Sequence, residues 1–102
     1  NDEKKTVLLK DVSYLESTDE NICVHTLAGE SFALTGTLDE IEKKYESHAL
    51  FRCHRFFIVN LYYVYRYKNR ALTFQDGTMI PVGKEYVNRF KYRLHELDYL
   101  GE

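Results

Sequence analysis

Near the middle of the chain, residues 51–61 read Phe51-Arg52-Cys53-His54-Arg55-Phe56-Phe57-Ile58-Val59-Asn60-Leu61. Two runs rich in aromatic and β-branched residues, Phe51–Cys53 and Phe57–Asn60, predict two short strands. Because neighbouring residues of a strand point to opposite faces, we expect Cys53 and His54 to face away from each other. The residues therefore predict part of a β-sheet.

The longer segment 51–70 has an unusual charge. It holds seven aromatic rings, no acidic side chain and five cations, which are Arg52, Arg55, Arg66, Lys68 and Arg70. Residues 1–50 carry a net charge of −6 and residues 71–102 a net charge of −1, so the overall charge of −2 conceals a local charge of +5. Such asymmetry concentrates positive potential and suits an anionic partner. It equally suits a solvated strand face whose cationic stems cover aromatic surface.

Length and composition predict one globular domain. The chain has 102 residues, of which 44% are apolar and 29% charged, and no apolar run is long enough to span a membrane. Because the sequence opens with Asn1 rather than Met, we expect residues 1–102 to be a single domain taken from a longer protein. Two cysteines thirty positions apart, Cys23 and Cys53, predict reduced thiols and a cytoplasmic location.

Short strands dominate the rest of the chain. Alternation or β-prone composition predicts strands at Thr6–Lys10, Val12–Ser17, Ile22–Leu27, Ser31–Thr35, Val64–Lys68, Ala71–Gln75 and Thr78–Val82. Polar residues 18–21 form a loop, and Asp76-Gly77 is a strong hairpin signal.

Two segments change to the helical period. Thr37-Leu38-Asp39-Glu40 has the spacing of a capping box, and the apolar stripe that follows it contains Leu38, Ile41 and Tyr45. This helix is expected to end by Ser47. A second helix starts at Lys84 and places Val87, Phe90, Leu94 and Leu97 on one stripe.

Catalysis and metal binding find little support. Cys53 and His54 cannot form a nucleophile and base if they point to opposite faces of a strand. The histidines His25, His48, His54 and His95 show no metal-ligand spacing, and the glycines lie in turns or at element ends rather than in a phosphate loop. We therefore expect no enzyme activity, no metal and no cofactor.

The motif 51–61 closely resembles the signature of the LytTR DNA-binding domain. Other parts occur in the order typical of that family: Asp11–Glu16, then Leu38–Ile41, and Asp76–Val82 before the last helix. The resemblance runs from about Thr6 to Leu97. It implies a mostly β, elongated domain of several small antiparallel sheets with two short helices.

The same resemblance implies a function in bacterial two-component systems. Such domains lie at the carboxyl end of response regulators, behind a receiver domain, and bind double-stranded promoter DNA, commonly at paired direct repeats. They present loops, rather than a recognition helix, to successive major grooves. A dimer on DNA, an absent receiver or sensory domain, and no membrane contact follow as expectations.

Three residues match the base-contacting positions of the family: Asn21 in the loop after the second strand, Arg55 in the signature, and Lys84 before the last helix. Arg55 can donate two bonds to guanine O6 and N7, whereas Asn21 can pair with adenine or cap a turn. Lys84 lacks the planar guanidinium of arginine, so we expect it to bind a phosphate or to make a weaker contact with guanine.

Weaker contacts with the DNA backbone are expected from Arg52, His54, Arg66 and Lys68. One of Arg52 and His54 is expected to stabilise the fold instead. Phe56 and Gly83 stand where many relatives have Ser, which removes hydroxyl donors for phosphate.

Two other functions remain open at this point. One is a protein-interaction β module in which segment 51–70 docks an acidic partner. The other is a single-stranded nucleic-acid binder that uses the rings of the same segment as stacking platforms.

Overall fold

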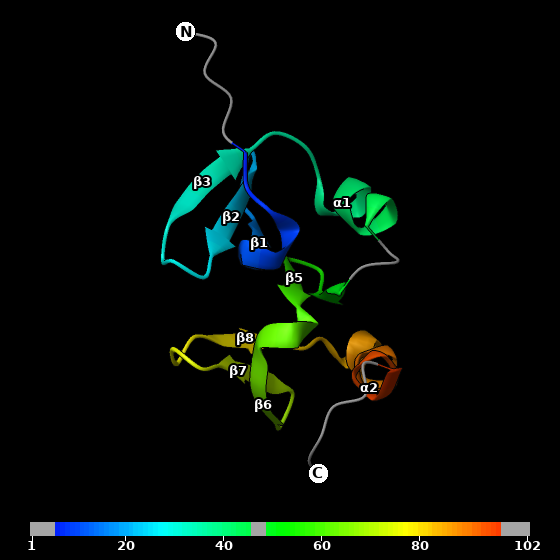
Figure 1. Cartoon of the computed structure of the whole chain (residues 1–102). Coiled ribbons are helices and arrows are strands. Elements are labelled where there is room, and N and C mark those ends of the chain that lie inside the picture. The colour runs from blue at the N-terminus through cyan, green and yellow to red at the C-terminus, as the bar shows by residue number, and fades with distance from the viewer. Residues whose placement is uncertain (1–5, 46–48, 97–102) are drawn as a thin grey trace, which may run out of the picture.

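The computed structural model describes residues 6–45 and 49–96 of the chain. These residues form two antiparallel sheets, two α-helices and three short 3₁₀ helices (Figure 1). The expected fold of small antiparallel sheets with two short helices is confirmed. None of the helices described is long and apolar enough to cross a membrane.

The larger sheet contains five strands. In spatial order they are β3 (Ser31–Leu34), β2 (Ile22–Thr26), β1 (Val12–Ser17), β5 (Phe57–Asn60) and β4 (Leu50–His54). Every neighbouring pair is antiparallel, and Glu16 of β1 lies opposite Phe57 of β5. The strands predicted for 51–53 and 57–60 are therefore the adjacent pair β4 and β5.

Both faces of this sheet are buried, which is why its strands lack a clean polar face. Along β4 and β5, Leu50 and Ile58 enter one core cluster, whereas Phe51 and Val59 enter the other. In β1, a bulge between Val12 and Tyr14 shifts the alternation, so that both Val12 and Leu15 lie in the first cluster.

The smaller sheet consists of β6 (Val64–Lys68), β7 (Ala71–Phe74) and β8 (Met79–Pro81). A two-residue turn joins β6 to β7, and its residues Asn69 and Arg70 both have positive φ, as a mirror-image hairpin turn requires. The predicted Asp76-Gly77 hairpin is confirmed. Gly77, at φ 95°, occupies the left-handed position that favours glycine.

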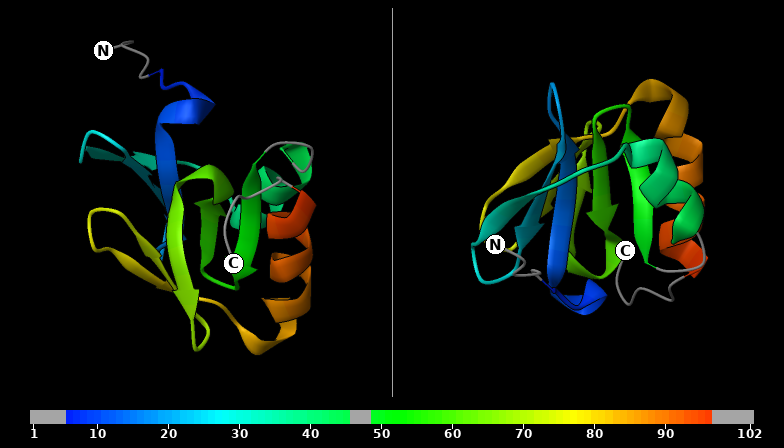
Figure 2. Two further views of the ribbon diagram at one scale, coloured as in Figure 1. Left: turned by 60° about the horizontal axis from the view of Figure 1, so that its bottom comes forward. Right: turned by 90° about the horizontal axis from the view of Figure 1, so that it is seen from above.

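Each helix covers one of the two core clusters. α1 (Leu38–Lys44) starts with the predicted capping box, in which the Glu40 amide donates to Thr37 Oγ1 and the Thr37 amide donates to Glu40 Oε1. α2 (Val87–Glu96) buries Phe90 against the smaller sheet and β4. Both helices lie on the β4 side of the molecule (Figures 1 and 2).

The apolar stripe of α2 agrees with the prediction, but the start of the helix does not. The stripe of α2 is confirmed for Val87, Phe90 and Leu94, whereas Leu97 lies outside the described residues. η3 (Lys84–Tyr86), a 3₁₀ turn, precedes α2, so the α-helix begins later than predicted.

The strand predicted for Thr6–Lys10 is wrong. The chain instead forms a 3₁₀ turn, η1 (Leu9–Asp11), in which the Asp11 amide donates to the Leu8 carbonyl over 2.8 Å. β1, which follows directly, already pairs with β2 and β5 on its two edges. A short β-prone run therefore gave way to local hydrogen bonding. A third 3₁₀ turn, η2 (Leu61–Tyr63), follows β5.

Candidate nucleic-acid interface

Two of the predicted site residues lie in adjacent turns at one end of the larger sheet. Asn21 is in the β1–β2 turn, residues 18–21, and Arg55 is in the β4–β5 turn. The Ser17 amide donates to the Phe56 carbonyl over 2.9 Å, which joins the two turns directly. From the order β2-β1-β5-β4, the centres of these turns are about 10 Å apart, or two strand spacings.

Lys84 belongs to the same end of the molecule. The Gly83 amide donates to the Cys53 carbonyl over 2.9 Å, so the segment that leaves β8 passes beside the β4–β5 turn. The right-hand view of Figure 2 shows the β1–β2 turn, the β4–β5 turn and the segment entering α2 along one side of the molecule. We call residues 18–21, 54–56 and 83–84 the turn edge. The structure thus brings Asn21, Arg55 and Lys84 to one edge.

The three side chains are available to a ligand. Arg55 and Lys84 are exposed and Asn21 is half-buried. Among the residues that the structure describes, none of these three side chains forms a hydrogen bond or an ion pair. Polar groups that solvent can reach and that hold no internal hydrogen bond are suited to contact bases or phosphates.

Thr18, rather than Asn21, closes the β1–β2 turn. Thr18 Oγ1 donates to the Asn21 carbonyl over 2.8 Å and accepts the Asn21 amide over 3.1 Å, and the Thr18 amide also donates to that carbonyl. The Asn21 side chain is therefore not needed as a cap. The Thr18-x-x-Asn21 spacing was the available signal for this arrangement, and it was missed.

The β4–β5 turn has an ordered internal structure. The Phe56 amide donates to His54 Nδ1 over 3.1 Å, which leaves His54 Nε2 as the ring donor. The Phe56 ring is 46% exposed, and the Arg55 guanidinium lies over it at 5.0 Å from the centroid. The turn therefore presents a cation stacked on an apolar ring, a pairing that was not predicted.

Arg52 does not point outward with Arg55, which argues against its predicted contact with the DNA backbone. Its side chain is only 10% exposed and binds Asp39 and Glu42 of α1. It also donates to the carbonyls of His54 and Arg55. The guanidinium is thus engaged inside the domain, which supports a role in the fold for Arg52 rather than a contact with DNA.

The predicted backbone contacts on β6 lie close to the turn edge. Lys68 and Arg66 are exposed, and Lys68 directly precedes the β6–β7 turn. The Arg70 carbonyl in that turn accepts the Val82 amide over 2.8 Å, one residue before Gly83. Lys68 therefore extends the turn edge, and Arg66 lies two residues further along the strand.

Gly83 has a packing role beside Lys84. A Cβ atom at this position would lie 3.1 Å from Cδ2 of Tyr86. Arg89 in turn covers the Tyr86 ring, at 4.8 Å from its centroid. The glycine thus lets Tyr86 pack closely against the backbone that presents Lys84.

Cys53 and His54 do not form a catalytic pair. Burial raises the pKa of the Cys53 thiol to about 12, and the fully buried sulfur lies 3.6 Å from the Pro81 carbonyl. His54 Nδ1 is occupied by the Phe56 amide. A protonated, buried thiol without an adjacent base is a poor nucleophile.

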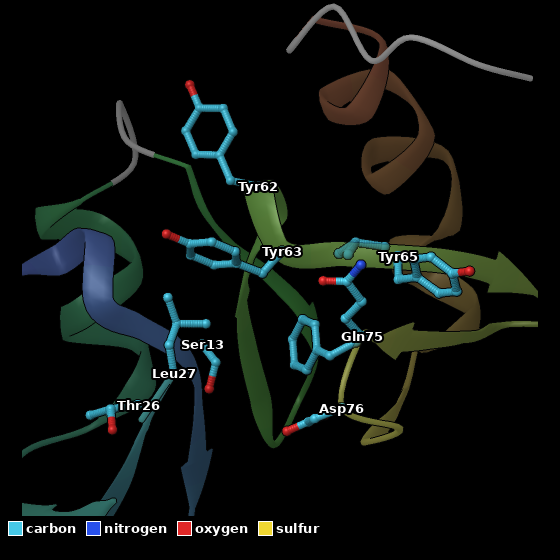
Figure 3. Close-up of a pocket in the computed structure, with 10 residues that line it drawn as sticks. Ser13, Thr26, Leu27, Tyr62, Tyr63, Tyr65, Gln75 and Asp76 are labelled. Carbon is cyan, nitrogen blue, oxygen red and sulfur yellow. The ribbon is translucent and has the colours of Figure 1, made fainter. Parts of the chain in front are cut away.

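The opposite end of the larger sheet carries an aromatic groove of about 410 Å³. Its lining residues are Ser13, Thr26, Leu27, Tyr62, Tyr63, Val64, Tyr65, Phe74, Gln75 and Asp76. β1 begins at this groove and ends at the turn edge. Figure 3 shows the rings of Tyr62, Tyr63 and Tyr65 leaving the chain in different directions. None of the described residues lining it is a lysine or an arginine.

The fold is a small, mostly β domain in which the β1–β2 turn, the β4–β5 turn and the segment before α2 lie along one edge. The chain belongs to the LytTR family of DNA-binding domains, because residues 2–95 match the sequence model of the LytTr DNA-binding domain.

Known proteins resemble the chain in sequence and in structure. It is 33% identical over 91 residues to the sensory transduction protein LytT of Bacillus subtilis and 30% identical over 86 residues to that of Enterococcus faecalis. These matches cover 84% and 79% of this chain, but only 37% and 36% of the relatives.

The structure is similar to a solved LytTr DNA-binding domain from Bacillus cereus. The TM-score is 0.76 at 27% sequence identity, and the match covers 86% of this chain and 84% of the other. The family inferred from residues 51–61 is therefore confirmed.

Proposed function

We propose that this domain binds double-stranded promoter DNA sequence-specifically, as the output part of a bacterial transcription regulator. The observation that carries the proposal is the gathering of Asn21, Arg55 and Lys84 on neighbouring turns of one edge. The first two turns are about 10 Å apart, which is less than the roughly 12 Å width of a major groove. A rigid duplex can therefore meet more than one of these turns at once.

Each residue has a role that follows from its chemistry. Arg55 is assigned to guanine, because its fork matches O6 and N7. Asn21 is assigned to adenine, and Lys84 to a guanine or a phosphate. His54, Arg66 and Lys68 are assigned to the DNA backbone, where His54 would donate through Nε2. Insertion of loops into successive major grooves, commonly at direct repeats, belongs to the same proposal. Because the first two turns are close enough to share one groove, the next groove would be met by Lys84 or by a second copy of the domain.

The domain would act within a longer cytoplasmic regulator. This chain covers little more than a third of the LytT relatives, which leaves room in such proteins for a receiver or sensory domain. Pairs of direct repeats would place two copies of the domain side by side on DNA.

A single-stranded nucleic-acid function has less support. Such proteins combine stacked rings with a cationic groove. Here the exposed rings Tyr62 and Tyr65 lie at the aromatic groove, which contains Asp76, whereas Arg55 and Lys84 lie at the turn edge. Phe56 is the exposed ring beside these cations, and the Arg55 guanidinium covers it. No contact described here favours a protein partner over DNA.

The test begins with selection of bound duplexes from a random pool. The selected duplex, a random duplex and the single strand are then titrated at about 50 and about 200 mM salt. With three phosphate contacts, we expect affinity to fall roughly 40-fold between these concentrations. We also expect clear preference for the selected duplex over both competitors. Affinity independent of salt, or equal affinity for all three, would contradict the proposal.

A further inference from the structure

Arg52 is tied to both α1 and the β4–β5 turn. Nη1 donates to Asp39 Oδ1 over 2.7 Å and to Glu42 Oε1 over 3.1 Å. On its other side, Nε donates to the His54 carbonyl over 2.9 Å and Nη2 to the Arg55 carbonyl over 2.6 Å. One guanidinium thus links the acidic face of a helix to two successive carbonyls of the turn.

These contacts restrain the backbone on both sides of the Arg55 side chain. The Arg55 carbonyl is held by Arg52, and the next amide, that of Phe56, is held by His54 Nδ1. The Phe56 carbonyl is held in turn by the Ser17 amide. Only a planar guanidinium can make these four hydrogen bonds of Arg52, because its N–H groups point in different directions and reach the carboxylates on one side and the carbonyls on the other.

We infer that Arg52 is a positioning residue for base recognition, which fixes the direction in which Arg55 projects from the turn edge. The inference rests on the proposed function, since it assigns to Arg52 an effect on the DNA contact of Arg55. Hydrogen bonds with a charged donor are strong, and a site held by such a supporting contact loses less entropy on binding. Asp39 and Glu42 contribute by orienting the guanidinium.

The first experiment measures the turn without DNA. Arg52→Lys keeps the charge but cannot supply the fork. We expect hydrogen exchange of the Phe56 amide to become roughly tenfold faster, because local opening of the turn becomes easier. Amides within α2, which Arg52 does not contact, should exchange at the unchanged rate. Unchanged exchange at Phe56 would overturn the inference.

The second experiment measures base preference on the selected duplex and on duplexes with single base-pair changes. We expect Arg52→Lys to reduce the preference about tenfold at the position that Arg55→Ala relaxes, and to leave the preference at other positions intact. In the Arg55→Ala background, Arg52→Lys should cause no further loss at that position. Lys43→Arg, the reverse exchange of an exposed cation at the far end of α1, is the matched control and should leave every preference unchanged.

The outcomes separate the two hypotheses. If Arg55→Ala relaxes one position but Arg52→Lys does not, the positioning role is wrong and the proposed function stands. A further loss in the Arg55→Ala background, together with a lower salt slope, would assign Arg52 to a phosphate and also overturn the inference. If no position depends on Arg55, the base contact proposed for Arg55 fails and the role of Arg52 fails with it.

If Arg52→Lys does not fold, the double variant Asp39→Asn, Glu42→Gln replaces it. This variant keeps the fork and weakens only its anchorage on α1. We expect the same loss of preference at the Arg55 position, with a smaller amplitude. An unchanged preference would overturn the role assigned to the α1 carboxylates and with it the link from helix to turn.

Discussion

The turn edge and the aromatic groove lie at opposite ends of the same strands, but the hydrogen bonds of their polar groups differ. At the turn edge, backbone groups are satisfied within the turns by Thr18, His54 and Arg52, and the longer side chains are left free. At the groove, the Tyr63 hydroxyl donates a hydrogen bond to the Lys10 carbonyl, and the Asp76 carboxylate accepts one from the Thr78 amide. The DNA contacts proposed above belong to the first end, whereas at the second end the Tyr63 hydroxyl and the Asp76 carboxylate are engaged within the domain.

Segment 51–70 contributes to both ends, so adjacency in sequence does not mean a shared site. β5 carries the chain from the turn edge to η2, and β6 carries it back toward Lys68. The rings of Tyr62, Tyr63 and Tyr65 consequently lie at the groove, whereas Arg55 and Phe56 lie at the turn edge. The comparison predicts that DNA binding depends on one end only.

The largest effect is expected from Arg55→Ala. Loss of a bidentate contact costs about 1 to 3 kcal/mol and should relax preference at a single base position. Affinities of the variant for the selected duplex and its single-change derivatives measure this. Lys43→Ala, an exposed cation at the far end of α1, controls for charge alone. A uniform loss on all duplexes would instead place Arg55 on the DNA backbone.

Neutralising the acidic residues of the β1–β2 turn is expected to increase the affinity for DNA, and by less than Arg55→Ala reduces it. Asp19 and Glu20 are exposed beside Asn21 and would repel phosphates. The double variant Asp19→Asn, Glu20→Gln should therefore tighten binding to random duplex about threefold to tenfold at low salt, and less at high salt, because exposed charges are screened.

Weaker binding of the Asp19→Asn, Glu20→Gln variant to the selected duplex would point to a direct contact with a base. If the double variant binds the selected duplex more weakly while its affinity for random duplex rises, a carboxylate accepts a bond from cytosine N4. Glu30→Gln, an exposed change outside both turns, controls for the loss of one negative charge elsewhere on the domain. A variant whose affinity for both duplexes is unchanged at low salt would remove the β1–β2 turn from the interface as we describe it.

Much of the fold could be predicted from the sequence, and the limits of that prediction have physical causes. The strands at 57–60 and 64–68 and the capping box at Thr37 follow from local patterns, so they were predictable. Arg52 and Arg55 look alike in sequence because both flank His54. Only the packing of α1, which brings Asp39 and Glu42 to Arg52 across 10 to 13 residues, distinguishes them. The β1 bulge likewise depends on strand pairing.

The smallest effect is expected at the aromatic groove. Tyr65 is 62% exposed and lines the groove, away from the turn edge, so Tyr65→Ala should change affinity for the selected duplex by no more than about twofold. Arg66→Ala, the next residue on β6, is the matched comparison. It should weaken binding to all duplexes and reduce the salt slope by about one, as loss of a phosphate contact requires. If Tyr65→Ala weakened binding to the selected duplex more than Arg66→Ala did, the groove would belong to the DNA site. The separation of the two ends would then be wrong. The Tyr65 ring lies away from the turn edge, so it could contribute to DNA affinity only if the duplex, or one of its strands, wrapped around β6.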